Sequence, residues 1–122
     1  MNSPTAFGSR IRISRRTKKL SQRDLAMLID ASPSYISKIE NDRTHYPPSE
    51  EVIGLLAHHL ELDADELFYL TGRVTVDDTK VISELAKTYQ KQLPVLLRQI
   101  RDNPDLIKKM LNYEHPIDNS KI

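Results

Sequence analysis

Two helix start signals, eleven residues apart, constrain the fold more than any other feature of the chain. Ser21 is suited to be an N-cap, because its hydroxyl can accept a hydrogen bond from a free N–H of the first turn, and Asp24 follows at capping-box spacing. Ser32 is a second N-cap, and Pro33 stands at the first helical position, where its missing N–H costs nothing. Between them, Asp30 tolerates the left-handed conformation that a tight turn can require. This stretch therefore predicts two short helices joined by a tight turn.

The second of these helices has one apolar face and one polar face. Ile36 and Ile39 recur at the spacing of a buried helical stripe. The outward face is left with small polar, aromatic and basic side chains, namely Ser34, Tyr35, Ser37 and Lys38. This is the helix-turn-helix layout, in which the second helix lies in the DNA major groove and its first residues meet base edges. The recognition helix is predicted at about residues 33–40.

Charge is distributed unevenly along a chain of 122 residues whose net charge is only +1. Residues 1–46 carry nine Lys or Arg against four Asp or Glu, whereas residues 47–72 carry six acids and no Lys or Arg. A basic block beside an acidic one indicates a module with one face suited to phosphates.

Several function classes are disfavoured by composition. Cysteine is absent, so there is no disulfide framework, thiol nucleophile or thiolate metal site. The chain has three glycines and no glycine-rich phosphate loop, and no catalytic constellation appears, so we expect no enzyme. His58 and His59 point about 100° apart on a helix, and we expect neither a metal nor a cofactor. No apolar run could span a membrane or serve as a cleaved leader, and the expected location is the cytoplasm.

The first 72 residues are predicted to form a five-helix domain. Apolar periods predict helices at about residues 6–19 and 48–60 on either side of the helix pair, and a fifth helix that follows Asp63 and ends at Gly72. A domain over residues 1–72 is near the size at which one small core can stand alone. Residues 73–77 are predicted to be an extended linker, which is either a short strand or a tether.

A second amphipathic segment spans residues 78–122, with its helical period interrupted at Pro94. It is too short to bury its apolar stripe alone, so it must pack on a second copy, on the first domain or on another protein. We expect a homodimer; the main alternative is a lid over Ile13, Met27 and Leu28. The predicted dimerisation residues are Val81, Ile82, Leu85, Tyr89, Leu93, Leu96, Leu97 and Ile100.

The chain resembles the Cro and phage-repressor type of helix-turn-helix regulators, the XRE-like family. The motifs that carry the resemblance run in the family's order over a little over half of the chain: F-G-S-R-I-R-I-S-R, L-S-Q-R-D-L-A, S-P-S-Y-I-S-K-I-E-N, P-P-S-E-E-V and L-L-A-H-H-L-E-L-D-A-D-E-L. The resemblance implies an all-α, five-helix lambda-repressor-like domain with a C-terminal helical appendage. It also implies sequence-specific binding of double-stranded DNA by a transcriptional repressor, associated with the nucleoid of a bacterium or phage.

The resemblance further implies roles for individual residues. Arg15 and Glu40 match an ion pair between the first and third helices of the family, in which a guanidinium can hold a carboxylate through two hydrogen bonds. The candidates for reading bases are Ser34, Tyr35, Ser37 and Lys38, and the loop from Arg43 to Tyr46 would lie along the DNA backbone. The candidates for binding phosphates are Gln22, Arg23, Ser32, Arg43, Thr44 and His45. A dimer would place two recognition helices about 34 Å apart on a near-palindromic operator.

The sequence departs from the family pattern at a few positions and leaves one alternative function open. Ser14 stands where an apolar core residue is usual, Ile13 stands where a polar one is usual, and Asn41-Asp42 replaces the more usual Asn-Gly. The same fold also serves protein-interaction adaptors and antitoxins, in which DNA binding is secondary. An adaptor should present acidic or apolar residues on the outward face of the third helix, whereas this chain presents Ser, Tyr, Ser and Lys.

Overall fold

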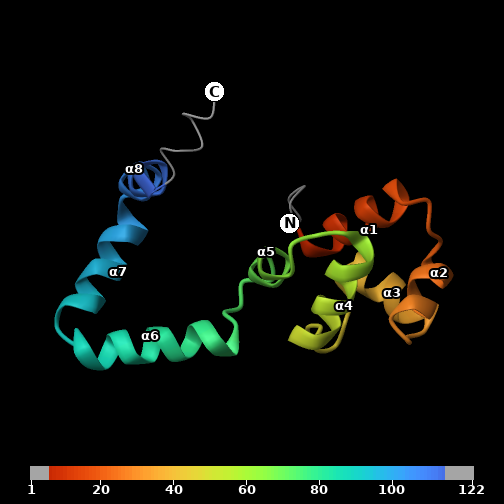
Figure 1. Cartoon of the computed structure of the whole chain (residues 1–122), viewed down its shortest axis with the longest axis horizontal. Helices are drawn as coiled ribbons and strands as arrows, with labels where there is room; N and C mark the ends of the chain where they lie inside the picture. Colours follow the sequence, from red (N-terminus) through yellow and green to blue (C-terminus); the bar gives the residue numbers. More distant parts are fainter. Residues whose placement is uncertain (1–5, 115–122) are drawn as a thin grey trace. The chain divides into compact units, whose positions relative to one another are not determined.

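The structure is a computed structural model that describes residues 6–114, and the regular structure in that range is entirely α-helical (Figure 1). The chain divides between Val76 and Asp77 into two compact units. The first unit contains α1 (Phe7–Thr17), α2 (Gln22–Leu28), α3 (Pro33–Glu40), α4 (Glu50–Leu60) and α5 (Ala64–Tyr69). The helices α6 (Val76–Thr88), α7 (Gln92–Asp102) and α8 (Pro104–Glu114) follow. The prediction of an all-α fold, with five helices followed by a helical C-terminal segment, is confirmed.

A single apolar core holds the first unit together. Its largest fully buried apolar side chains come from all five helices: Ile11, Leu25, Ile36, Ile39, Ile53, Leu56 and Leu67. Each buried side chain of this kind stabilises the fold by about 1.5–3 kcal/mol relative to an exposed one. The two isoleucines of α3 therefore hold this helix on the domain while its other side faces outward.

Four of the five helices in the first unit, α2 to α5, begin at a capping side chain. The Ser21 hydroxyl accepts a hydrogen bond from the Asp24 N–H, and the Asp24 carboxylate accepts one from the Ser21 N–H, both at 2.9 Å. The hydrogen bonds from Ser21, its backbone N–H first, hold the pKa of Asp24 below its ordinary value. Ser32, Ser49 and Asp63 cap α3, α4 and α5, each accepting from the N–H three residues later.

Four helices of the first unit end in the same type of backbone turn, although none of them has glycine at the turn position. After α3, the N–H groups of Asp42 and Arg43 donate to the carbonyls of Ile39 at 3.1 Å and Lys38 at 2.8 Å, which is the Schellman pattern. The residue at the turn takes a left-handed conformation, which costs an L-residue roughly 1–2 kcal/mol. Residues with φ between 55° and 59° hold this position after α1 to α4: Lys19, Asp30, Asp42 and Glu61.

The C-terminal helices begin and break at positions other than those expected. Because α6 begins at Val76, residues 76 and 77 are helical, and residues 73–75 form neither a strand nor a helix. The break in the helical period falls at residues 89–91, not at Pro94. Pro94 is the third residue of α7, and N–H groups in a first turn have no helical partner to lose. Proline is therefore tolerated there.

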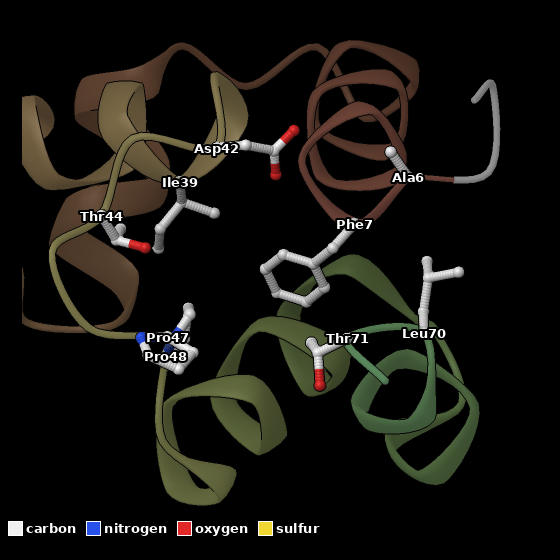
Figure 2. A pocket seen from close by; sticks show the side chains of 9 residues that line it. All are labelled: Ala6, Phe7, Ile39, Asp42, Thr44, Pro47, Pro48, Leu70 and Thr71. Atoms are coloured by element: carbon white, nitrogen blue, oxygen red, sulfur yellow. The ribbon is translucent and has the colours of Figure 1, made fainter. Parts of the chain in front are cut away.

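The amino end of α1 packs directly against the carboxyl end of α3. A Cβ placed on Gly8 would lie 2.6 Å from the carbonyl oxygen of Glu40 and 2.7 Å from that of Ile39. Next to it, Phe7 points into the space between α3 and Leu70, beside a hollow of about 290 Å³ (Figure 2). Only glycine allows this approach without displacing the last turn of α3.

Replacing Gly8 tests this contact. Gly8→Ala should lower the free energy of unfolding by about 1–3 kcal/mol, because its methyl group overlaps backbone oxygens that cannot rotate away. Gly54→Ala is the matched control: a Cβ on Gly54, within α4, meets nothing within 4 Å, so alanine should raise stability by about 1 kcal/mol. Urea unfolding of both variants measures the difference, and a stabilising effect at both positions would contradict the close approach.

Candidate nucleic-acid interface

The carboxylate of Glu40 connects the first three helices. Arg15 of α1 donates from Nε to Oε2 at 2.6 Å and from Nη2 to Oε1 at 3.0 Å. Gln22, the first residue of α2, donates from Nε2 to Oε1 at 3.1 Å. The Glu40 side chain is 0% exposed, and Arg15 uses a further N–H on the Leu20 carbonyl at 2.8 Å. The end of α3 is thereby held by both preceding helices.

The environment of Glu40 favours its ionised form. Burial acts to raise the pKa of this carboxyl group, but hydrogen bonds from Arg15 and Gln22 and the charges of Arg15 and Arg12 outweigh it, so the pKa lies below its ordinary value. The hydrogen bond to Glu40 likewise raises the pKa of Arg15, against the effect of burial. The two groups therefore remain charged over the whole physiological range.

Arg12 makes a contact with the end of α3 that was not predicted from the sequence. Its Nη2 donates to the Glu40 carbonyl at 3.0 Å and to Asn41 Oδ1 at 2.8 Å. A cation is favourable at a helix C-terminus, where free carbonyls carry partial negative charge. The available signal was its position three residues before Arg15, which places both side chains on one face of α1.

The outward face of α3 carries the four predicted base-reading residues. Ser34 and Lys38 are exposed, whereas Tyr35 and Ser37 are partly buried. The Tyr35 ring packs against the edge of the core, so its position is better defined than that of Lys38. The helix begins with Pro33 as its first residue. The start of α3 thus combines a capped end with polar side chains that point away from the core.

Two of the predicted phosphate-binding residues also have structural partners. The Ser32 hydroxyl accepts from the Tyr35 N–H at 3.1 Å and lies 3.1 Å from the Ser34 hydroxyl. The Gln22 amide uses one N–H on Glu40 and has a second N–H and a carbonyl oxygen for other partners. Both side chains are therefore held in place by contacts within the domain.

The loop between α3 and α4 brings predicted phosphate-binding residues next to predicted base-reading residues. A hollow of about 400 Å³ is lined by Tyr35 and Lys38 of α3 and by Thr44, His45 and Tyr46 of the loop, among others. The rings of His45 and Tyr46 lie edge to face with centroids 4.6 Å apart. Arg23 and Arg43 are exposed and do not line this hollow.

Comparison with known families assigns residues 8–73 to the helix-turn-helix domain. The chain belongs to the helix-turn-helix domain family. The match covers more than half of the chain, confirms the predicted helix-turn-helix identity, and places the protein among DNA-binding regulators of transcription.

Curated proteins and solved structures were also compared. No curated protein matches the chain. A similar solved structure is that of the clp gene regulator ClgR from Corynebacterium glutamicum, at 24% identity over 74% of this chain and 93% of that chain, with a TM-score of 0.48.

Within residues 6–114, no helix combines the length and the apolar character needed to cross a lipid bilayer. No three His, Asp or Glu side chains in that range are grouped as metal ligands would be. The rings of His58 and His59 lie edge to face with centroids 4.9 Å apart.

The ion pair at Glu40 should make the free energy of unfolding depend on pH. The pKa of Glu40 is lowered in the folded state, so the stabilisation by this pair is fully present above the unfolded-state pKa of about 4.3. It is lost as pH falls through the folded-state pKa. Glu40→Gln should remove this dependence and cost about 3–5 kcal/mol at pH 7, since Arg15 would stay buried without a counter-ion.

Urea unfolding between pH 7 and pH 3 checks this expectation. Glu61→Gln is the control, because it breaks the exposed pair with Lys18 and should change stability little. An unaltered pH profile in Glu40→Gln would show that another group controls acid unfolding.

Proposed function

We propose that the protein is a transcriptional repressor that recognises a specific operator by placing α3 in the major groove of double-stranded DNA. The observation that carries the proposal is the orientation of α3: Ile36 and Ile39 face the core, while Ser34 and Lys38 are exposed on the other side. A helix with this arrangement at the second position of a helix-turn-helix can reach base edges with its first residues.

Sequence reading is assigned to the outward residues of α3. Lys38 can donate to guanine O6 and N7, and Tyr35 can pack against a thymine methyl or donate its hydroxyl. Ser34 and Ser37 can donate or accept, so they discriminate bases weakly. Lys38 and Tyr35 therefore supply most of the specificity.

Positioning is assigned to contacts with the phosphates. The residues are Gln22, Arg23, Ser32, Arg43, Thr44 and His45, and they supply affinity that does not depend on sequence. The contact between Gln22 and Glu40 supports this role, because it fixes the direction of the Gln22 amide. The negative charge of Glu40 does not oppose DNA, since Arg15 pairs with it at 2.6 Å and Arg12 lies 3.6 Å from it.

The DNA-bound form is proposed to be a homodimer that pairs through the second unit. The apolar residues predicted for dimerisation in α6 and α7 are exposed or half-buried there, which leaves them available to a partner. Two linked recognition helices about 34 Å apart would match one turn of B-DNA, so the operator is proposed to be near-palindromic.

Variants of α3 test base reading. Lys38→Ala should cost about 1–3 kcal/mol of affinity for a selected operator, with a much smaller loss on random DNA. Tyr35→Phe keeps the packing of the ring and removes only the hydroxyl. It should therefore lower the ratio of operator affinity to random-DNA affinity while the fold stays intact. Lys87→Ala, an exposed lysine of α6, is the control. Binding titrations on both DNAs decide the matter, and an unchanged operator-to-random ratio in both α3 variants would refute the assignment.

Variants at the phosphate positions should behave differently. Arg43→Ala and Gln22→Ala should weaken binding to operator and random DNA equally. Arg43→Ala should also reduce the slope of log affinity against log salt by about 0.9, the value of one lost phosphate contact. Titrations from 50 to 200 mM salt measure that slope. Because Gln22→Ala also removes a hydrogen bond to Glu40, the unfolding curve of this variant is recorded as a control for stability. A changed ratio of operator affinity to random-DNA affinity in either variant would count against the phosphate-binding role.

A further inference from the structure

Residues 73–75, between α5 and α6, are fixed on the first unit by contacts of their own. Thr75 is buried, and its N–H donates a hydrogen bond to the Tyr69 hydroxyl at 3.4 Å. Arg73 is half-buried, although arginine is mostly found exposed to solvent. This segment is therefore part of the first unit, and Arg73 is placed to contact other elements of that unit.

The guanidinium group of Arg73 makes three contacts. Its Nη2 donates a hydrogen bond to the Pro48 carbonyl, and its Nε donates one to Thr71 Oγ1 at 3.0 Å. Its Cζ lies 4.5 Å from the centroid of the Phe68 ring, which is within the distance of a cation–π interaction. The donors of a guanidinium have a fixed planar geometry, so the contacts at the end of α5 set the direction of the bond to Pro48.

The loop between α3 and α4 has few other hydrogen bonds. At its start, the Arg43 N–H donates to the Lys38 carbonyl at 2.8 Å, and at its end Ser49 caps α4. Among the described residues, no other hydrogen bond to residues 44–48 accompanies the one from Arg73. Pro48 is also the buried residue of this loop, whereas residues 45–47 are exposed. The contact between Arg73 and Pro48 therefore attaches the later part of the loop to α5.

Packing alone does not fix the loop, because a hollow lies on either side of it. Thr44 and Pro47 line the hollow of about 290 Å³, and Thr71 lies across it (Figure 2). The same two loop residues line the hollow of about 400 Å³ beside Lys38. Segments with few buried contacts open easily. The position of the loop therefore depends strongly on its attachment at Pro48.

We propose that Arg73 is a positioning residue for DNA binding, because its hold on the Pro48 carbonyl keeps Thr44 and His45 in place to bind phosphates. The inference rests on the phosphate-binding role proposed for this loop, and it assigns part of the affinity to a residue that does not touch DNA. A loop that is ordered before binding loses less conformational entropy in the complex. Releasing Pro48 therefore weakens binding to all DNA sequences alike.

Arg73→Met tests the contact with Pro48 in the absence of DNA. Methionine keeps an unbranched side chain on the Phe68 ring and removes both donors. Nitrogen-15 relaxation of the full chain should show the backbone order parameters of residues 44–46 falling from about 0.85 to below about 0.6. Arg10→Met is the matched control, because it removes the same charge from the same unit and breaks only the contact with Glu66. It should leave the order parameters of the loop unchanged.

A milder variant covers the case in which Arg73→Met does not fold. Thr71→Val keeps the shape of the side chain but removes the oxygen that accepts from Arg73 Nε. The guanidinium then loses one of its two hydrogen bonds, so the order parameters of residues 44–46 should fall in the same direction by a smaller amount. Its unfolding curve is recorded, since the Thr71 hydroxyl also donates to the Phe68 carbonyl at 2.6 Å.

Binding titrations connect the loop to DNA. Arg73→Met should weaken binding to operator and random DNA by the same factor, roughly fivefold, as expected for coupling through contiguous contacts. In a chain that already carries Thr44→Ala and His45→Ala, the same substitution should cost less than about twofold, because the contacts that Arg73 positions are absent. A direct contact of Arg73 with a phosphate would give the same factor in both backgrounds. Arg10→Met should bind both DNAs nearly as the wild type does.

The outcomes separate this inference from the proposed function. Unchanged order parameters in both Arg73→Met and Thr71→Val would overturn the contact as the attachment of the loop. A loosened loop with unchanged affinity, or equal factors in the two backgrounds, would overturn the positioning role. A wild-type chain that binds neither DNA would remove the proposed function and the positioning role together, while the order parameters would still show whether Arg73 holds the loop.

Discussion

The position of α3 depends on a buried carboxylate. α3 has only eight residues, and Ile36 and Ile39 anchor one side of it. Glu40 adds a polar anchor at its end, where Arg15 and Gln22 hold the side chain and Arg12 holds the carbonyl. Desolvation offsets much of the attraction in such a pair, so its main contribution is to geometry rather than to net stability. A short surface helix needs that geometric control, because a small rotation would redirect every outward side chain.

The helix-turn-helix could be predicted from sequence because its signals are local. The caps at Ser21 and Ser32 act within one turn, and the isoleucine spacing of α3 is visible in four residues. The contacts of Gln22 and Arg12 with residues 40 and 41 were not predicted, since they join positions 18 or more residues apart and depend on helix angles. For Arg12, the face that it shares with Arg15 was the available signal. The predicted break at Pro94 was wrong for another reason. A sequence does not distinguish a proline that breaks a helix from one that stands in the first turn of a helix. The assignment of bases and phosphates to particular side chains stays a prediction.

The two units manage apolar surface in opposite ways. In the first unit, five short helices turn their apolar stripes towards one another and share one core. In the second unit, the described side chains of α6, α7 and α8 build no comparable core. A unit with a shared core and a segment whose described side chains are mostly exposed thus lie on one chain. Under the proposed function, the first would bind DNA and the second would associate, so that substitutions could alter one and spare the other.

The left-handed residues at four helix ends make the first unit less stable than it would be with glycine at those positions. None of these positions is glycine, so the backbone there stays in a conformation that L-residues adopt at a cost. Natural proteins are held just above the stability that their function demands, and strain of this kind keeps a domain near that threshold. Proteases attack a small domain largely through its transiently open state. Glycine at these four positions is therefore expected to slow proteolysis of the first unit, because glycine adopts the left-handed conformation without steric cost.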